Sequence, residues 1–218
     1  MEGERGASSR KQAGIRSWIE MKTYAWTDTD AIVQRLDEGG IVAFPTDTVY
    51  GVGVPYGNLD DLERLKQAKR RPEEKPIPMM ISDLRQIEQV AYVSPKTRRL
   101  IDAFMPGALT IVVRRKDSVD PAYTNGKDTI ALRMPDLEPL LAVIRQIGRP
   151  LMVTSANMSG EPTALTYEDA LSQLGHIDAI VQGTCRDLQA STIVDCTNDA
   201  FVILREGAIP EEKIREVL

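Results

Sequence analysis

The chain has 218 residues, of which 42% are hydrophobic, and a formal net charge of −5 at pH 7. It is long enough to bury one substantial core, and its negative charge argues against wholesale polyanion binding, because nucleic-acid-binding domains usually carry net positive charge or a large basic face. No run approaches the roughly 20 apolar residues that span a bilayer, and no apolar run follows a basic start as in a secretory signal, so we expect a cytoplasmic protein without membrane contact.

The hydrophobic pattern separates an extension from a folded region. Residues 1–20 are polar and lack sustained periodicity, and we interpret them as a disordered extension or a cloning remnant. We interpret residues 21–218 as a single domain, because chains of this size usually remain undivided.

Within that domain, apolar runs of strand type alternate with segments of helical periodicity. Helices are predicted at 28–36, from 59 to 70 or 71, and at 83–91, 95–104, 136–147 and 166–174. Strands are predicted at 41–44, 77–81, 109–114, 129–133, 151–154, 179–181, 192–194 and 201–205. Some strands are separated by helices and others only by short loops, which favours a twisted, mixed parallel and antiparallel sheet flanked by helices, an α/β (α+β) fold.

The cysteines and the single histidine limit the chemistry. Cys185 and Cys196 lack the spacing of a redox or zinc pair, so we expect free buried thiols. Zinc hydrolases and histidine-based triads would have to use His176, which matches no surrounding motif. We expect His176 to be a structural or surface residue.

Polar residues directly follow the predicted strand 41–44. The sequence Pro-Thr-Asp-Thr-Val-Tyr-Gly-Val-Gly at 45–53 places hydroxyl groups, including that of Thr48, at a strand end, where open α/β sheets commonly bind ligands. The same composition is also typical of a polar turn. A dinucleotide-binding G-x-G-x-x-G motif is excluded, because the glycine after Gly53 is Gly57.

Four basic residues cluster at the end of the helix that begins at 59. They are Lys69, Arg70, Arg71 and Lys75. Such residues can hold a polyphosphate through charge-assisted hydrogen bonds, although ordinary helix C-termini also collect lysine and arginine. The prolines at both ends of residues 72–76 fix the backbone, which makes phosphate binding the better interpretation.

Further candidates stand at the ends of later strands. Residues 154–160, Thr-Ser-Ala-Asn-Met-Ser-Gly, present small hydrogen-bonding groups suited to a base, a ribose or an amino acid, or form a Ser/Asn turn. Arg133 and Arg205 each end an apolar strand and can clamp a carboxylate or phosphate, although exposed strand-end charges are common. Ser191 is a weaker candidate that also suits the start of an edge strand.

Seven segments between residues 41 and 207, read together and in order, resemble the YrdC-like threonylcarbamoyl-AMP synthase family. They are Pro-Thr-Asp-Thr-Val-Tyr-Gly, Ala-Lys-x-Arg-Pro, Pro-Gly-x-Leu-Thr, Arg-x-Pro, Thr-Ser-Ala-Asn-x-Ser-Gly, Ser-Thr-x-Val-Asp and Arg-Glu-Gly. Any one segment can arise by chance, but seven in family order make coincidence a poor explanation.

The resemblance implies a nucleotidyltransferase that converts L-threonine, bicarbonate and ATP into threonylcarbamoyl-AMP and pyrophosphate, with Mg²⁺ carried by ATP and no metal site of the protein. It also implies partner proteins that pass the threonylcarbamoyl group to an adenosine beside the tRNA anticodon. The residues that it assigns to threonine are Thr48, Arg133, Ser155 and Ser191. Those that it assigns to ATP are Lys69, Arg71, Lys75, Thr129, Asn157 and Arg205, with Lys69 and Arg71 as the catalytic pair.

Three features depart from the family pattern or limit it. Lys75 stands where many relatives carry asparagine, and Met80 stands where some carry histidine, so their substrate contacts are in doubt. The chain ends at Leu218, shortly after Arg-Glu-Gly, and so resembles the single-domain type.

Two other functions remain open on the sequence. A double-stranded RNA or tRNA-binding module without catalysis would use a basic surface. Its residues would be Lys66, Lys69, Arg70, Arg71 and Lys75, together with Lys96, Arg98, Arg99, Arg114, Arg115 and Lys116. A nucleotide hydrolase is the second alternative, although the sequence has no Walker-type glycine loop.

Overall fold

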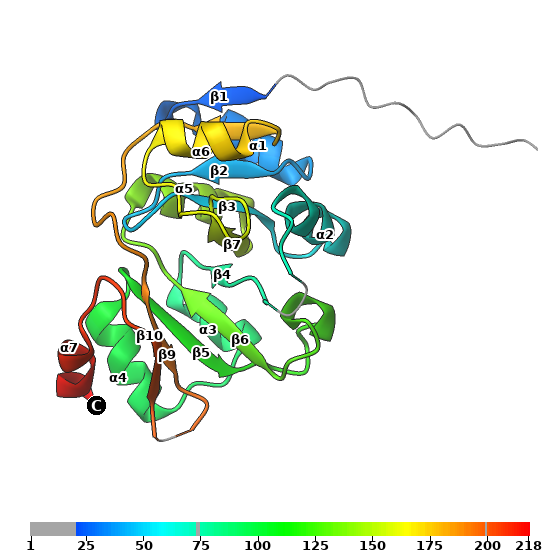
Figure 1. Ribbon diagram of the computed structural model, residues 1–218. Helices are drawn as coiled ribbons and strands as arrows, with labels where there is room; N and C mark the ends of the chain where they lie inside the picture. The colour runs from blue at the N-terminus through cyan, green and yellow to red at the C-terminus, as the bar shows by residue number, and fades with distance from the viewer. Residues whose placement is uncertain (1–20, 73–74, 199) are drawn as a thin grey trace, which may run out of the picture.

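The computed structural model describes residues 21–72, 75–198 and 200–218, so the interpretation of residues 1–20 lies outside the described part of the chain. Ten strands form one sheet in the order β1-β8-β2-β3-β7-β4-β6-β5-β9-β10 (Figure 1). The strands are β1 (Lys22–Tyr24), β2 (Val42–Phe44), β3 (Gly51–Pro55), β4 (Met79–Met80), β5 (Leu109–Arg114), β6 (Thr129–Arg133), β7 (Leu151–Ser155), β8 (Ala179–Val181), β9 (Thr192–Asp195) and β10 (Val202–Arg205).

Within the described ranges, seven α-helices and two short 3₁₀ helices accompany these strands. They are η1 (Trp26–Asp28), α1 (Thr29–Asp37), α2 (Leu59–Ala68), α3 (Leu84–Val90), α4 (Pro95–Phe104), η2 (Pro121–Thr124), α5 (Glu138–Ile147), α6 (Tyr167–Leu174) and α7 (Glu211–Val217). No helix of the described chain is long and apolar enough to cross a membrane.

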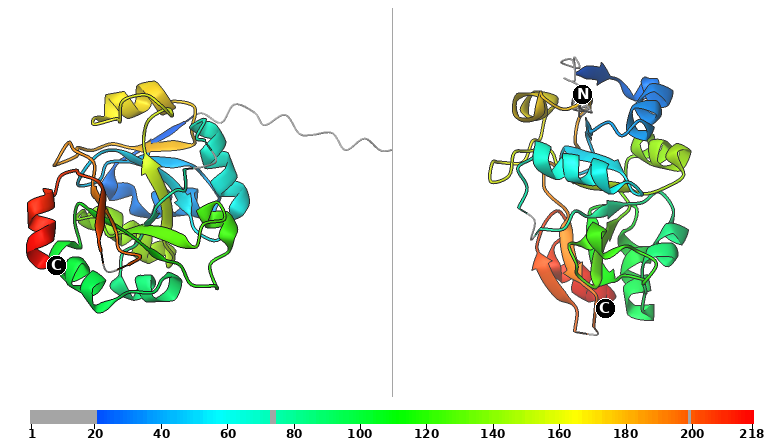
Figure 2. Two further views of the ribbon diagram at one scale, coloured as in Figure 1. Left: turned by 60° about the horizontal axis from the view of Figure 1, so that its bottom comes forward. Right: turned by 90° about the vertical axis from the view of Figure 1, so that its right-hand side faces the viewer.

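The sheet mixes parallel and antiparallel pairs, as the sequence predicts. Strand β8 lies parallel to β1 and β2, and β5 lies parallel to β9, whereas β3 is antiparallel to both β2 and β7. The predicted flanking helices are also present (Figure 2). That residues 21–218 form a single domain stays a prediction.

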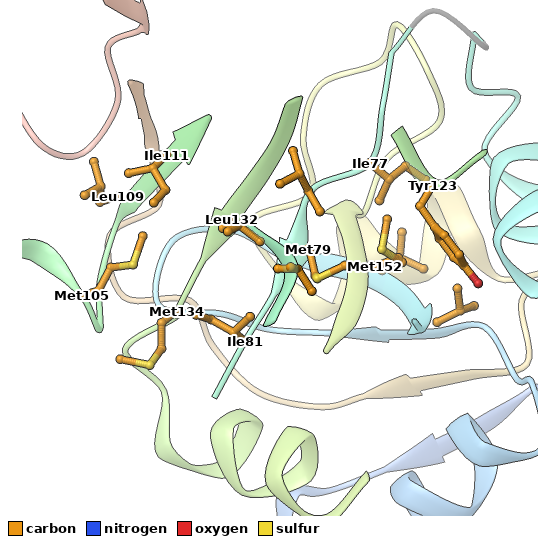
Figure 3. Packing of buried hydrophobic residues seen from close by; sticks show 14 of the residues in the cluster. Ile77, Met79, Ile81, Met105, Leu109, Ile111, Tyr123, Leu132, Met134 and Met152 are labelled. Atoms are coloured by element: carbon orange, nitrogen blue, oxygen red, sulfur yellow. The ribbon is translucent and has the colours of Figure 1, made fainter. Parts of the chain in front are cut away.

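Strand β4 joins two halves of the sheet, one formed by β1, β8, β2, β3 and β7 and the other by β6, β5, β9 and β10. Met79 pairs with Met152 of β7 on one side and with Leu132 of β6 on the other, and Figure 3 shows these three side chains together in the core. The predicted strand 77–81 is reduced to two residues, because Pro76 and Pro78 have no N–H to donate to a ladder.

Two buried clusters cover the sheet. Helices α1 and α5 pack against each other and cover one cluster, which includes Ile32, Leu36 and Ile144 with Val42 and Val153 of the sheet. The larger cluster includes residues of α2, α3, α4, α6 and α7 and the inner positions of β4, β5 and β6. These layers fix the strand ends from which the site residues emerge.

Four predicted elements have the observed bounds and most of the others differ from them by one or two residues, whereas β1, β3, α7 and the two 3₁₀ helices were missed. Strands β5, β6 and β8 and helix α4 have the predicted residues. Strand β3 was predicted as part of a polar loop, because glycine is disfavoured in strands. A Cβ at Gly53 would lie 2.6 Å from the Met152 carbonyl oxygen, so close backbone approach requires glycine there. Strand β1 and helix α7 had not been given bounds, since each has only a short apolar pattern.

Candidate functional site

One cavity of about 540 Å³, within the usual range for small-molecule sites, opens between the two halves of the sheet. Its walls come from β3, β4, β5, β6, β7, β9 and β10 and from the segments that flank them. It is lined by seven of the predicted site residues, namely Thr48, Arg71, Thr129, Arg133, Ser155, Ser191 and Arg205. The structure places Lys69, Lys75 and Asn157 outside this lining. A separate, shallower hollow beside Tyr56 and Tyr123 contains none of the predicted residues.

Arg133 is the most deeply buried cation of the cavity, with 5% of the residue exposed. Its guanidinium donates to the Asp47 carboxylate at 2.5 Å, to the Thr48 hydroxyl at 2.8 Å and to the Gly107 carbonyl at 3.0 Å. Burial lowers the pKa of Arg133, and the neighbouring Asp47 carboxylate opposes that effect. The alternative that Arg133 is an ordinary exposed strand-end charge is therefore wrong.

The turn after β2 holds Thr48 in place. The Thr46 hydroxyl accepts hydrogen bonds from the backbone N–H groups of Thr48 and Val49 and lies 3.0 Å from the Thr48 hydroxyl. This is the polar turn that the composition indicates, and the same turn lines the cavity. The turn and ligand-site interpretations of residues 45–53 are thus compatible.

The end of helix α2 explains why its basic residues point in different directions. Arg70 has a φ of 50°, and the N–H groups of Arg70 and Arg71 donate to the carbonyls of Gln67 and Lys66 at 3.0 and 2.9 Å. This is the Schellman pattern, with arginine at the position that usually carries glycine. It buries Lys69 to 2% exposure while Arg70 stays at the surface and Arg71 enters the cavity lining.

Lys69 lies behind the cavity wall rather than in it. Its amine donates a short hydrogen bond to the carbonyl of Ser155, which does line the cavity. Burial, and after it the nearby Arg71 charge, lower the pKa of Lys69 to about 7. A phosphate group near this amine would favour its charged form.

Arg71 is held by three acceptors. Its guanidinium donates to the carbonyls of Lys75 and Pro76, each at 2.9 Å, and to the Thr154 hydroxyl at 3.1 Å. Lys75 thus contributes through its backbone, whereas its side chain is exposed. Burial also lowers the pKa of Arg71.

The segment after β7 forms a tight polar turn. The Ser155 hydroxyl donates to the Asn157 side-chain oxygen at 2.6 Å, and the Asn157 amide donates to the carbonyls of Met158 and Glu161. Asn157 is therefore placed to orient Ser155 at the cavity wall.

Ser191 and Arg205 come together at the opposite wall. The Ser191 hydroxyl lies 2.8 Å from that of Thr110, and Arg205 donates to the Ser191 carbonyl at 2.8 Å and to its hydroxyl at 3.2 Å. Although Arg205 is largely exposed, desolvation of its guanidinium, and after it the nearby Arg133 charge, lower its pKa. Both groups therefore face the same anion-attracting region as Arg133.

Several lining residues had no predicted role, although some fall within the quoted motifs. The additional polar ones are Thr46, Thr110, Lys127, Thr154, Thr163, Asp195 and Thr197. Strand alternation is the signal for Asp195, because residues 191, 193 and 195 share one strand face and Ser191 was already selected. Thr110 has no such signal, because no residue of β5 was selected, although it ends the Pro-Gly-x-Leu-Thr segment. Asp47 lies behind the lining, and its pairing with Arg133 has no local signal in the sequence.

The two cysteines and the histidine are not part of the cavity lining. Cys185 and Cys196 are free and buried, as predicted. His176 is exposed, with Nε2 2.9 Å from the Ala68 carbonyl oxygen, which confirms a structural or surface role. In the described part of the chain, no group of three or more His, Cys, Asp or Glu side chains is placed to hold a metal ion.

The basic residues of the alternative RNA surface are largely engaged within the molecule. Arg98 pairs with Glu88, Lys116 donates to the Glu88 carbonyl, and Arg115 donates to backbone carbonyls including that of Lys127. These contacts fix the side chains to the protein surface, which makes a polyanion-binding role less well supported.

Comparison with known proteins gives consistent matches. The Sua5/YciO/YrdC family model, described as "Telomere recombination", matches residues 34–207. The chain is 40% identical over 214 residues to a threonylcarbamoyl-AMP synthase of Bacillus subtilis (strain 168), with 91% of this chain and 62% of the relative covered. It is 37% identical over 189 residues to a putative threonylcarbamoyl-AMP synthase of Mycobacterium tuberculosis (strain CDC 1551 / Oshkosh), with 85% and 87% covered.

A solved structure, that of P. abyssi Sua5 complexed with L-threonine, matches with a TM-score of 0.85 and 33% sequence identity. The match covers 91% of this chain and 60% of that chain. This chain thus spans about three fifths of the length of the B. subtilis and P. abyssi proteins.

Proposed function

The chain belongs to the Sua5/YciO/YrdC family, and on that premise we propose that it is an L-threonylcarbamoyladenylate synthase. The reaction joins L-threonine, bicarbonate and ATP to give threonylcarbamoyl-AMP, pyrophosphate and water. The observation that carries the proposal is that Arg71, Arg133 and Arg205, far apart in the sequence, converge with serine and threonine hydroxyls on one cavity. That L-threonine is bound by the P. abyssi protein supports it as the amino-acid substrate.

We propose that Arg133 binds the threonine carboxylate. Three of its five N–H groups already have acceptors among the described residues, and the remaining two suit a carboxylate. The hydroxyls of Thr48, Ser155 and Ser191 surround the same space and are proposed to hold the rest of the amino acid.

The ATP phosphates are proposed to lie between Arg71 and Arg205, with Lys69 behind Ser155. The threonine nitrogen forms a bond to the bicarbonate carbon with loss of water, and a carbamate oxygen then attacks the α-phosphorus while the bond to pyrophosphate breaks. Such a transfer depends on positioning and on stabilising phosphate charge, which the fixed cations supply. Thr129, Lys75 and Asn157 stay as predicted ATP-side residues, the last two through the groups that they orient.

Mg²⁺ is proposed to enter with the nucleotide, where it would neutralise phosphate charge. The described residues provide single carboxylates near the cavity rather than a ligand cluster, which fits an ion held mainly by phosphate oxygens. The product is proposed to pass to tRNA threonylcarbamoyl-transfer proteins, and the reaction to take place in the cytoplasm.

Pyrophosphate release tests the proposal. Purified protein is incubated with MgATP and bicarbonate, with L-threonine, L-serine or no amino acid. We expect threonine-dependent release that falls by roughly 100-fold or more in Arg71→Met and Arg133→Met. Arg149→Met is the matched control, because Arg149 pairs with Asp37 at the exposed surface. Release without threonine would indicate a hydrolase, and salt-sensitive RNA binding without any release would favour the RNA-binding module.

A further inference from the structure

Strands β6, β5 and β9 lie side by side in the sheet, and their cavity-lining residues form rows across it. Val112 of β5 stands opposite Ala131 of β6 and Asp195 of β9, so these three form one row across the sheet. The next row contains Thr110 of β5 opposite Ile193 of β9. All five residues line the cavity, because successive residues on one strand face are two positions apart.

The row of Thr110 and Ile193 lies at the cationic end of the cavity, and the next row contains the acidic Asp195. Arg205 pairs across the sheet with Ile193, and Arg133 lies two residues beyond Ala131 on the same face of β6. On β9, Asp195 comes two residues after Ile193, which is a step of roughly 7 Å along the strand and away from the row of Arg205. Val112 and Ala131 therefore lie beside Asp195 in its own row, and together with Ile193 of the next row they form an apolar strip. Along β9, Ile193 separates Asp195 from Ser191, whose carbonyl accepts a hydrogen bond from Arg205.

The Asp195 carboxylate is fixed in direction. Its Oδ1 accepts hydrogen bonds from the Thr197 backbone N–H at 2.9 Å and from the Thr197 hydroxyl at 2.6 Å. None of the hydrogen bonds between described residues uses Oδ2, so one acceptor remains at the end of the apolar strip. A donor is available at the same end from Lys127, which also lines the cavity.

This pattern matches a ligand with an anionic end, a flat apolar middle and a hydrogen-bond donor at its far end. A nucleotide has that shape and chemistry. We propose that Asp195 selects the base of the nucleotide by accepting a hydrogen bond from the exocyclic amino group of adenine. The assignment rests on the proposed ATP-dependent function. Guanine also presents N–H donors, so the test includes GTP as a comparison.

Nucleotide binding without threonine tests the assignment independently of the reaction. Calorimetry compares binding of the Mg²⁺ complexes of ATP, ITP and GTP. The base of ATP carries the exocyclic amino group, that of ITP carries a carbonyl in its place, and that of GTP carries the carbonyl and an amino group at another position. Wild-type protein should bind ATP about 10- to 100-fold more tightly than ITP or GTP, the usual effect of a hydrogen bond to a charged group. Asp195→Asn should bring the ATP to ITP ratio close to one, because an amide both accepts and donates.

Asp128→Asn is the matched control, because Asp128 is exposed close to the same end of the cavity but outside its lining. It should keep the wild-type ratio. Tighter binding of GTP than ATP, or an unchanged ratio in Asp195→Asn, would overturn the assignment. If Asp195→Asn does not fold, N6,N6-dimethyl-ATP and wild-type protein decide: binding as tight as that of ATP rejects the assignment, and weaker binding supports it.

The two proposals fail separately. Selective ATP binding through Asp195 without threonine-dependent pyrophosphate release would reject the synthase function alone. Threonine-dependent release that proceeds equally well with ITP would reject only the role of Asp195.

Discussion

Replacing Asp47 by asparagine should lower the free energy of unfolding by about 3–5 kcal/mol, the usual cost of removing one partner of a buried ion pair. The Asp47 side chain is completely buried and that of Arg133 is 7% exposed. Asparagine fits the same space but carries no charge, so the guanidinium would stay buried without its counterion. The second carboxylate oxygen has no hydrogen-bond partner among the described residues, which leaves Arg133 as the main interaction of Asp47.

Urea unfolding followed by circular dichroism measures this loss, which corresponds to a fall in melting temperature of roughly 6–20 °C for a chain of this size. Asp136→Asn is the control, because it breaks an exposed ion pair with Arg186 and should cost no more than about 1 kcal/mol. The double variant Asp47→Asn with Arg133→Gln should lose less than the sum of the single losses, since neither charge is then left alone. A loss in Asp47→Asn as small as in the control would refute the reasoning.

Lys69 should make both stability and ATP binding depend on pH. The pKa of Lys69 in the folded chain is lowered to about 7, so between that pH and the ordinary lysine pKa the unfolded chain binds more protons than the folded one. The free energy of unfolding should therefore rise with pH over this range. Bound phosphate restores the charge, so ATP affinity should fall by up to about tenfold per pH unit above 7, and calorimetry in buffers of different ionisation enthalpy should detect proton uptake that Lys69→Met abolishes. Arg70→Gly should stabilise the fold by roughly 1 kcal/mol in thermal unfolding, because φ of 50° strains a residue with a Cβ; destabilisation would show that the Arg70 side chain contributes more than its backbone strain costs. Gly207→Ala should cost about 1–3 kcal/mol and weaken threonine-dependent turnover, because the new Cβ would lie 2.6 Å from the Ser191 carbonyl carbon; wild-type stability and turnover would contradict this.

The sequence alone was sufficient to predict the positions of residues that depend on a single strand or helix. The strand-end positions of Arg133 and Ser155 follow from apolar runs. Proline chemistry predicted the end of α2 only approximately, because the helix ends at Ala68 rather than at Arg70 or Arg71. The predicted helix 166–174 is also present, and the side chains of Thr166 and Asp169 each accept a hydrogen bond from the other's backbone N–H at its first turn.

Features that depend on contacts between distant segments could not be predicted in this way. Gly53 belongs to a strand because the β7 backbone approaches it, and nothing in its neighbours along the chain indicates that approach. Asp47 is read locally as a turn residue, yet its carboxylate meets a guanidinium 86 residues away. The burial of Arg133 depends on that meeting, because a buried guanidinium requires a counterion and hydrogen-bond acceptors.

The three arginines that line the cavity and Lys69 behind its wall share one structural arrangement, and it bears on how they would act. Lys69, Arg71, Arg133 and Arg205 each donate to at least one backbone carbonyl, from Ser155, Lys75 and Pro76, Gly107 and Ser191 respectively. Backbone acceptors belong to the sheet and its turns, so they fix the direction of each cation before a ligand arrives. Burial lowers the pKa of all four, which means that an incoming anion relieves an existing cost. Positioned, partly desolvated cations of this kind can stabilise charge on a transferring phosphoryl group without reorganisation. The proposed reaction would therefore depend on arginine and lysine rather than on a nucleophilic side chain.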